Sequence, residues 1–163
     1  MENIKPQYSL RLVNFKDEKI IFKWANDPDV RRWSFNDRLI KFDEHKIWFN
    51  NKLNDSNVLM WIFKENINPA GLVRLEKNNN EVLLNYLIAP DSRGKGLAGK
   101  MLNMAINEVR SHWSNSSIQA YTMPDNIASI KSLENAGFCL KSMDEKKIVM
   151  YINKTSEINL SDK

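Results

Sequence analysis

The most informative stretch of this chain is Ile88-Ala89-Pro90-Asp91-Ser92-Arg93-Gly94-Lys95-Gly96-Leu97-Ala98-Gly99. It follows a run of strand-forming residues, 82–88, and it opens into an amphipathic helical pattern over 97–110. Three of the chain's five glycines lie within it. A glycine-rich turn before a helix exposes backbone N–H groups that have no intrahelical partner, and the helix dipole adds partial positive charge. The stretch therefore predicts an anion cradle, best suited to phosphate, where a strand meets a helix.

Strands and helices on both sides of this junction are predicted from hydrophobic periodicity and turn residues. Strands are expected at 8–13, 58–64, 70–76, 82–88, 117–122, 138–143 and 147–152, and helices at 20–26, 28–33, 43–53, 97–110 and 126–136. The length of 163 residues predicts one domain, over 1–153, followed by a polar tail, 154–163, that we expect to be disordered. The order of the elements predicts a mixed α/β sheet whose ligand lies at the carboxyl ends of strands.

Composition narrows the class of protein. The formal net charge of +4 is small and the basic residues are scattered, which argues against nucleic acid as a partner. The single cysteine, Cys139, excludes an intramolecular disulfide, and its apolar neighbours predict a buried structural thiol. The histidines and the cysteine lack the spacing of a metal site, so no metal is expected. Since neither a signal peptide nor a membrane span is evident, we expect a cytoplasmic protein that does not bind membranes.

Three kinds of phosphate cradle are compatible with a glycine-rich turn before a helix. The Walker pattern G-x-x-x-x-G-K-[ST] fails, because Gly94, Gly96 and Gly99 have the wrong spacing and Lys100 precedes a methionine. The dinucleotide pattern G-x-G-x-x-G is present at 94–99. It lies in the middle of the chain, however, after strands that look antiparallel, and no acidic ribose partner follows about 20 residues later.

The third kind fits better. The pattern Arg93-x-x-Gly96-x-Ala98 resembles the acetyl-CoA motif, Q/R-x-x-G-x-G/A, of the GCN5-related N-acetyltransferases (GNAT). A second segment, Asn126-x-x-Ser129 followed by Gly137-Phe138, is similar to the Asn-x-x-Ser and Gly-Phe segment of that family. The resemblance covers about residues 8–152. It implies a single-domain GNAT fold, with a mostly antiparallel sheet of six to seven strands, about four flanking helices, a bulged fourth strand, and splayed fourth and fifth strands.

The resemblance also implies acetyl-CoA as the acetyl donor and direct attack by a neutral amine. The residues implied to contact the pantetheine and the thioester are Tyr86, Leu87 and Ile88. The residues implied to hold the pyrophosphate are Arg93, Gly94, Lys95, Gly96, Leu97, Ala98 and Gly99, with Asn126 and Ser129 on the other side of the cofactor. A backbone N–H beside the thioester can stabilise the oxyanion by roughly 3–4 kcal/mol.

Direct attack requires a base for the amine and is helped by an acid for the leaving thiolate. Many family members use a tyrosine seven residues after the asparagine as the acid, whereas this chain has Leu133 there. The resemblance to ribosomal-protein N-terminal acetyltransferases makes Ser129 the candidate acid. The candidate bases are Glu81, near the position where many members carry a strand glutamate, and His45 or Glu44 on the acceptor side. The alternative readings are a solvated strand-end carboxylate for Glu81 and a partly exposed helix residue for His45.

The N-terminal segments 24–36 and 44–49 are similar to acetyltransferases that act on UDP-linked 4-amino-dideoxy sugars, as in pseudaminic acid biosynthesis. In that branch the two N-terminal helices form the acceptor pocket. The resemblance makes Arg31, Arg32 and Lys41 candidates for contacts to a diphosphate. The candidates for the acceptor site are Arg32, Trp33, Asn36, His45, Trp48 and Asn85. The tryptophans could equally belong to the core, and Asn85 could be a hydrogen-bonded core amide.

We therefore expect an acetyl-CoA-dependent N-acetyltransferase that acts, as a monomer or homodimer, on a small-molecule amine, specifically the 4-amino group of a UDP-linked amino sugar. Two acceptor alternatives remain open at this point: protein N-termini, which favour an open cleft, and polyamines, which favour surrounding carboxylates. A non-catalytic CoA-binding module is the alternative of another class. Release of CoA thiol in the presence of an amine separates an enzyme from such a module.

Overall fold

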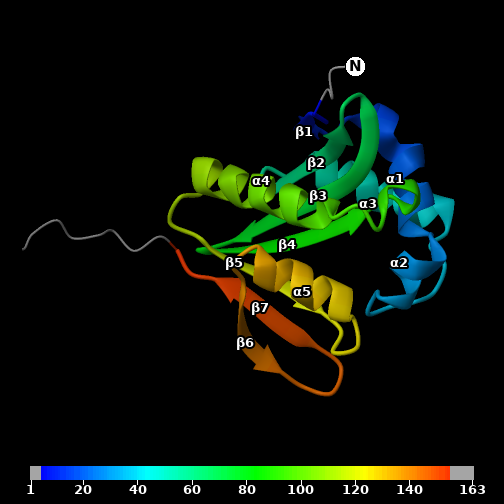
Figure 1. The fold of residues 1–163 in the computed structure, drawn as a ribbon. Coiled ribbons are helices and arrows are strands. Elements are labelled where there is room, and N and C mark those ends of the chain that lie inside the picture. The colour runs from blue at the N-terminus through cyan, green and yellow to red at the C-terminus, as the bar shows by residue number, and fades with distance from the viewer. Residues whose placement is uncertain (1–4, 155–163) are drawn as a thin grey trace, which may run out of the picture.

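A computed structural model describes residues 5–154 of the chain. They form one seven-stranded sheet with the strand order β1-β2-β3-β4-β5-β7-β6 (Figure 1). The strands are β1 (Tyr8–Leu12), β2 (Val58–Glu65), β3 (Asn68–Asn78), β4 (Glu81–Ile88), β5 (Ser117–Thr122), β6 (Cys139–Met143) and β7 (Ile148–Ile152). Neighbouring strands are antiparallel except β4 and β5, which are parallel. The expected tail at 154–163 lies almost wholly outside the described residues.

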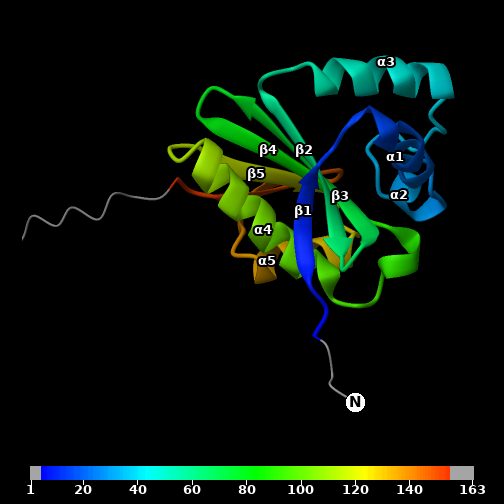
Figure 2. The same cartoon turned by 90° about the horizontal axis from the view of Figure 1, so that it is seen from above.

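Five α-helices flank the sheet: α1 (Glu18–Ala25), α2 (Pro28–Arg32), α3 (Phe42–Leu53), α4 (Leu97–His112) and α5 (Ile127–Asn135). Short 3-10 turns precede α1 and the glycine-rich loop, at Phe15–Asp17 and Pro90–Ser92. Helices α4 and α5 cover one face of the sheet, and α1, α2 and α3 lie on the other, over the half that contains β1 to β4 (Figures 1 and 2). The mixed α/β prediction is confirmed, and no helix within residues 5–154 has the length and apolar character that a membrane span requires.

Helix α4 follows from the apolar stripe that the sequence shows after the glycines. Its stripe residues are all buried at 3% exposure or less: Leu97, Met101, Leu102, Ala105 and Val109. They pack with β4 and α5 residues, including Leu84 and Leu133, in the larger of two core clusters. Burial of this stripe fixes α4 against the sheet, so the loop before the helix is held at the end of β4.

The fourth and fifth strands diverge soon after they begin to pair. Strands β4 and β5 pair only at Glu81↔Ser117, Val82↔Ile118 and Leu83↔Gln119. The expected splay is therefore present. The expected bulge in β4 is wrong, because its register with β3 is continuous from Gly71↔Ile88 to Asn78↔Glu81. Loss of the β5 partner, and not an inserted residue, leaves one edge of β4 open.

The free cysteine also differs from its expected environment. Cys139 is exposed, as are all five residues of β6. Strand β6 is the last strand of the sheet and pairs with β7 alone. The preceding Phe138 is buried at 3% exposure. The prediction of a buried thiol is therefore wrong. The apolar neighbours of Cys139 did not indicate burial, because Cys139 and Leu140 lie on an edge strand beside solvent.

Candidate active site

The glycine-rich loop has the backbone of an anion cradle. Gly94 and Gly96 have positive φ angles of 74° and 69°, a conformation that L side chains rarely adopt. No atom lies within 4 Å of a Cβ placed at either glycine, so one side of the loop is open. Gly96 is the N-cap of α4 and makes no side-chain cap hydrogen bond, which leaves the first N–H groups of a 16-residue helix free. These features fit a pyrophosphate.

The open edge of β4 carries unpaired backbone groups beside this loop. The N–H of Ala89 donates to the carbonyl of Ala70 at 2.9 Å. Because antiparallel pairs alternate between hydrogen-bonded and non-hydrogen-bonded, Leu87 also turns its backbone groups toward β3. Tyr86 and Ile88 turn theirs toward the space from which β5 has departed. Of the three residues expected to meet the thioester through their backbone, two therefore have free groups and Leu87 does not.

A cavity of about 450 Å³ lies on the other side of β4, under α1, α2 and α3. Its floor includes Asn85, Tyr86 and Leu87. Strand β4 therefore borders both this cavity and the gap that opens where β4 and β5 diverge. The side-chain Nδ2 of Asn85 is buried and has no hydrogen-bond partner. A buried amide donor without a partner is costly, and in the floor of a cavity it is available to an acceptor oxygen on a ligand.

Positive charge dominates the wall of this cavity. Three arginines line it, namely Arg31, Arg38 and Arg74, against the single carboxylate of Glu44. Arg38 pairs with Glu44 at 2.8 Å. Arg74 pairs with Glu76 at 2.6 Å, and its guanidinium lies 5.1 Å from the ring centroid of Trp48. Both of these arginines therefore have a carboxylate partner.

Arg31 has no carboxylate within 4.0 Å among the described residues. Its terminal nitrogens donate to the carbonyls of Asn36 and Arg38, at 3.1 and 3.4 Å, and to the hydroxyl of Ser34, at 3.0 Å. Its Nε is buried without a partner. Burial and repulsion from Arg38 lower the pKa of Arg31 below its usual value, against a smaller opposing attraction from Asp37. A partly buried guanidinium favours an anionic partner.

The structure separates the acceptor-site candidates into two groups. His45, Trp48 and Asn85 line the cavity, whereas Arg32, Trp33 and Asn36 do not. Arg32 is exposed, and its guanidinium lies 4.9 Å from the ring centroid of Trp33. Arg31 was predicted from the sequence as a diphosphate contact, whereas Arg38 and Arg74 were not predicted. Arg74 could have been found from the sequence. Side chains alternate along a strand, so Arg74 lies on the same face of β3 as Leu72, which also lines the cavity.

The candidate bases lie in different environments. His45 is 2% exposed, with Nε2 3.1 Å from the carbonyl of Glu18, and burial lowers its pKa. That contact fastens α3 to α1. Glu44 is exposed, and its hydrogen bond with Arg38 lowers its pKa. The structure does not bring Glu81 to the cavity: at about 3.3 Å per residue it lies roughly 17 Å along β4 from Tyr86.

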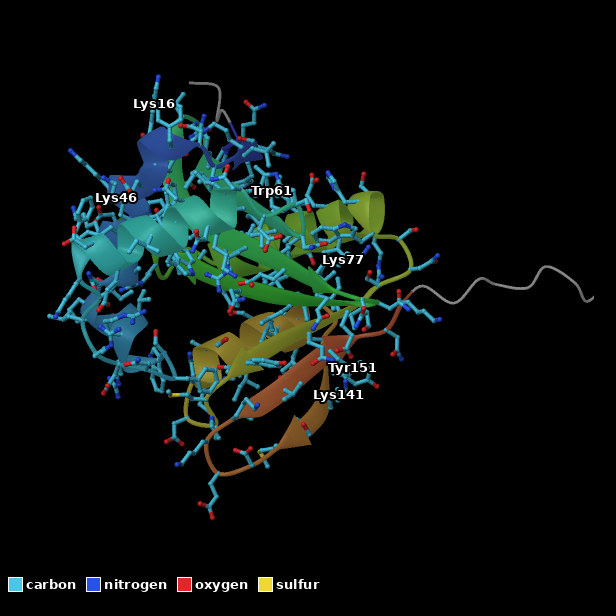
Figure 3. All side chains as sticks on the ribbon, turned by 180° about the vertical axis from the view of Figure 1, so that it is seen from behind. Lys16, Lys46, Trp61, Lys77, Lys141 and Tyr151 are labelled. Carbon is cyan, nitrogen blue, oxygen red and sulfur yellow. The ribbon has the colours of Figure 1, made fainter. Side chains whose placement is uncertain are left out.

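Glu81 belongs to a second, smaller hollow of about 400 Å³ at the far end of the sheet. Gln119 Nε2 donates to its carboxylate at 2.5 Å, and Lys141 lies 3.4 Å away. Lys141 and Tyr151, which also line this hollow, lie on the β6–β7 side of the molecule, away from α3 (Figure 3). These contacts agree with a strand-end carboxylate in a surface ion pair.

A pair of hydroxyl groups connects β4 to α5 across the gap. Tyr86 Oη lies 3.0 Å from Ser129 Oγ. The side chain of Asn126 caps α5 by accepting the N–H of Ser129 at 3.1 Å. Burial raises the pKa of Tyr86. Leu133, at the position of the usual family tyrosine, is fully buried in the core. The Tyr86 side chain was not singled out from the sequence, where only its backbone was considered.

The resemblance assigns Arg93 to the pyrophosphate, whereas its side chain in the structure is engaged by two carboxylates at the start of helix α2. Its guanidinium bonds to Asp27 at 2.6 Å and to Asp29 at 3.0 Å. Elsewhere among residues 5–154, no group of three or more His, Cys, Asp or Glu side chains is placed to hold a metal ion.

Residues 8–139 match the family model described as the acetyltransferase (GNAT) domain. Acetyltransferase PseH of Campylobacter jejuni is 27% identical over 147 residues, which cover 86% of this chain and 87% of that protein. Spermidine N-acetyltransferase from Vibrio cholerae, solved with CoA and spermine, has a TM-score of 0.82 at 22% identity and covers 91% of this chain and 96% of its own. Aminoglycoside acetyltransferase AAC(6')-Ib, solved with coenzyme A, has a TM-score of 0.77 at 18% identity, covering 91% and 95%.

Proposed function

The chain belongs to the GNAT family of acetyltransferases, and from that premise we propose that it acetylates the amine of a phosphate-bearing acceptor, specifically the 4-amino group of a UDP-linked amino-dideoxy sugar. The family membership itself makes the protein an N-acetyltransferase that uses acetyl-CoA. The proposal concerns the acceptor. The similarity of 24–36 and 44–49 to UDP-amino-sugar acetyltransferases supports it.

The observation that carries the proposal is Arg31 at the cavity wall, a partly buried guanidinium whose Nε has no partner and which has no carboxylate within 4.0 Å among the described residues. Phosphate and carboxylate groups pair with guanidinium through short, charge-assisted hydrogen bonds. A polyamine would instead bring several positive charges against three arginines and one glutamate, an unfavourable like-charge arrangement. At 22% identity, the likeness to spermidine N-acetyltransferase concerns the fold alone.

In the proposed complex, acetyl-CoA supplies an acetyl group activated as a thioester. The backbone of 94–99 holds the pyrophosphate, and the N–H groups of Tyr86 and Ile88 are available to the thioester oxygen. Glu44 is the single carboxylate lining the cavity, so we assign it the task of orienting the amine and receiving its proton. His45 stays in the same wall and holds α3 in place through Glu18. We assign the protonation of the leaving thiolate to Tyr86 with its partner Ser129, whose hydroxyl groups lie 3.0 Å apart.

Adjacent arginines on α2 offer a matched test of the acceptor site. Arg31→Gln should raise the KM for the UDP-amino sugar at least tenfold, because the phosphate loses its charged partner, while the KM for acetyl-CoA changes little. Arg32→Gln, on the exposed side of the same helix, should leave both constants near those of the wild type. Steady-state thiol release measures the KM for the UDP-amino sugar and the KM for acetyl-CoA in each of the two variants. Equal effects of the two substitutions would contradict the assignment.

A further inference from the structure

The ion pairs of Arg93 connect two parts of the molecule that are far apart in sequence. Arg93 immediately precedes the cradle glycines, and its partners Asp27 and Asp29 lie 66 and 64 residues earlier. The side chains of Arg93 and Asp27 are 32% and 17% exposed, so this pair is partly withdrawn from water. Asp29 is 66% exposed and adds a weaker contact.

Asp27 uses the same carboxylate to begin α2. Its Oδ1 accepts the N–H groups of Asp29 and Val30, at 3.2 and 3.4 Å, as the helix N-cap. Burial alone would raise the pKa of Asp27, but hydrogen bonds from Arg93 and from these backbone groups bring it below its usual value. The carboxylate is therefore ionised at neutral pH and holds the cradle loop and the start of α2 together.

Helix α2 leads directly to the cavity wall. Arg31 lies on this helix and lines the cavity, and it holds the loop carbonyls of Asn36 and Arg38. Ser34 Oγ donates to the carbonyl of Val30 at 2.6 Å. Polar contacts thus run without a break from Arg93, through α2, into the loop at 33–41.

If Arg93 turned instead to a phosphate, Asp27 and Asp29 would lose their cation, and Asp27 would keep only its two backbone N–H donors. We propose that Arg93 is a positioning residue that couples the donor cradle to the acceptor cavity, so that ordering the cradle also orders α2 and the loop at 33–41. By linkage the coupling is reciprocal: a ligand in the cavity tightens the binding of CoA to the same degree.

Coenzyme A alone can test this coupling, because the readout does not require the acceptor to be known. Hydrogen exchange of peptides covering 26–40 is measured with and without saturating CoA, and the Kd of CoA is measured by calorimetry. In the wild type, CoA should slow exchange in 26–40 severalfold. In Arg93→Met the protection should vanish while the Kd rises no more than about threefold.

Three further variants test the contact itself, and a fourth is a control at another ion pair. Asp27→Asn keeps an N-cap side chain and removes the charge, so it should lose the protection as Arg93→Met does. The double variant should be no worse than either single one. Arg93→Lys keeps the charge and should retain part of the protection. Arg11→Met breaks a comparable Arg–Asp pair, at 2.8 Å to Asp17 and away from the cradle, and should leave the protection intact.

Three results would overturn the proposal. A Kd raised more than tenfold in Arg93→Met would make Arg93 a phosphate ligand. Protection of 26–40 that persists in Arg93→Met would show that α2 is ordered by another route. A wild type without any protection would show that the two sites are independent. A wild-type protein that is inactive on UDP-amino sugars would refute the proposed acceptor. The hydrogen-exchange and CoA-binding measurements do not depend on that result.

Discussion

At the scale of single residues, orientation decides which side chains form the site. Arg31 and Arg32 are neighbours in a five-residue helix, and only Arg31 lines the cavity. So short a helix has too few turns for an apolar stripe, and the sequence therefore could not show which arginine faces inward. Asn85 was predictable as a site residue, because it is a lone polar side chain in an apolar strand. Its missing hydrogen-bond partner supports that reading.

Tyr86 and Ser129 carry the prediction at this scale. Tyr86→Phe removes the hydroxyl with little change in shape, and we expect kcat to fall roughly 10²-fold, the lower end for a general acid, while the KM for acetyl-CoA stays within about threefold. Because burial raises the pKa of Tyr86, its phenol is protonated at neutral pH and is an acid rather than a base.

The exposed Tyr121 provides the control for that substitution, and Tyr121→Phe should leave kcat unchanged. Ser129→Ala should reduce kcat less than Tyr86→Phe, because it removes only the partner of the phenol. Pre-steady-state and steady-state rates over pH 6–9 give these values. A Tyr86→Phe variant with wild-type kcat would exclude the pair from proton transfer.

At the scale of elements, periodicity gave most of the strands and helices to within a few residues. Strand β5 lies at Ser117–Thr122, as expected, and α4 extends two residues beyond its predicted end at Arg110. The splay of β4 from β5 came from the family resemblance. It is invisible to periodicity, because a strand that loses one partner keeps the same alternation. The bulge also came from the family resemblance, and it is absent. Nothing in the sequence of 81–88 shows whether β4 contains an inserted residue or only loses its β5 partner.

The cradle loop supplies the prediction at the scale of elements. Gly96→Ala should lose roughly 1–2 kcal/mol of unfolding free energy, because φ is +69° there, and should weaken CoA binding at least tenfold as the loop shifts. Gly137→Ala meets the same backbone penalty at φ +94°, beyond the end of α5 and outside the cradle. Gly137→Ala should therefore lose a similar unfolding free energy and keep its affinity for CoA.

Urea unfolding measures the loss of stability in both variants, and calorimetry measures their Kd for CoA. Equal losses of CoA affinity would contradict the cradle assignment.

At the scale of the whole molecule, the candidate site forms around β4, which borders both the β4–β5 gap and the cavity. The open edge of β4 faces the gap between β4 and β5, and Asn85 and Leu87 of the same strand line the cavity under α1, α2 and α3. The proposed donor side was accessible from sequence because most of its residues are contiguous, in 86–99. The proposed acceptor side was not, because its arginines come from α2, the following loop and β3, which only the folded chain brings together.

The central claim is that this positive cavity selects a phosphate-bearing amine over a polycationic one. The most direct measurement is kcat/KM for thiol release from acetyl-CoA with a UDP-4-amino-dideoxy sugar, spermidine and a ribosomal N-terminal peptide under identical conditions. We predict that the UDP-linked sugar exceeds both other acceptors by at least 10²-fold. A kcat/KM for spermidine or the peptide equal to or above that of the sugar would contradict the claim.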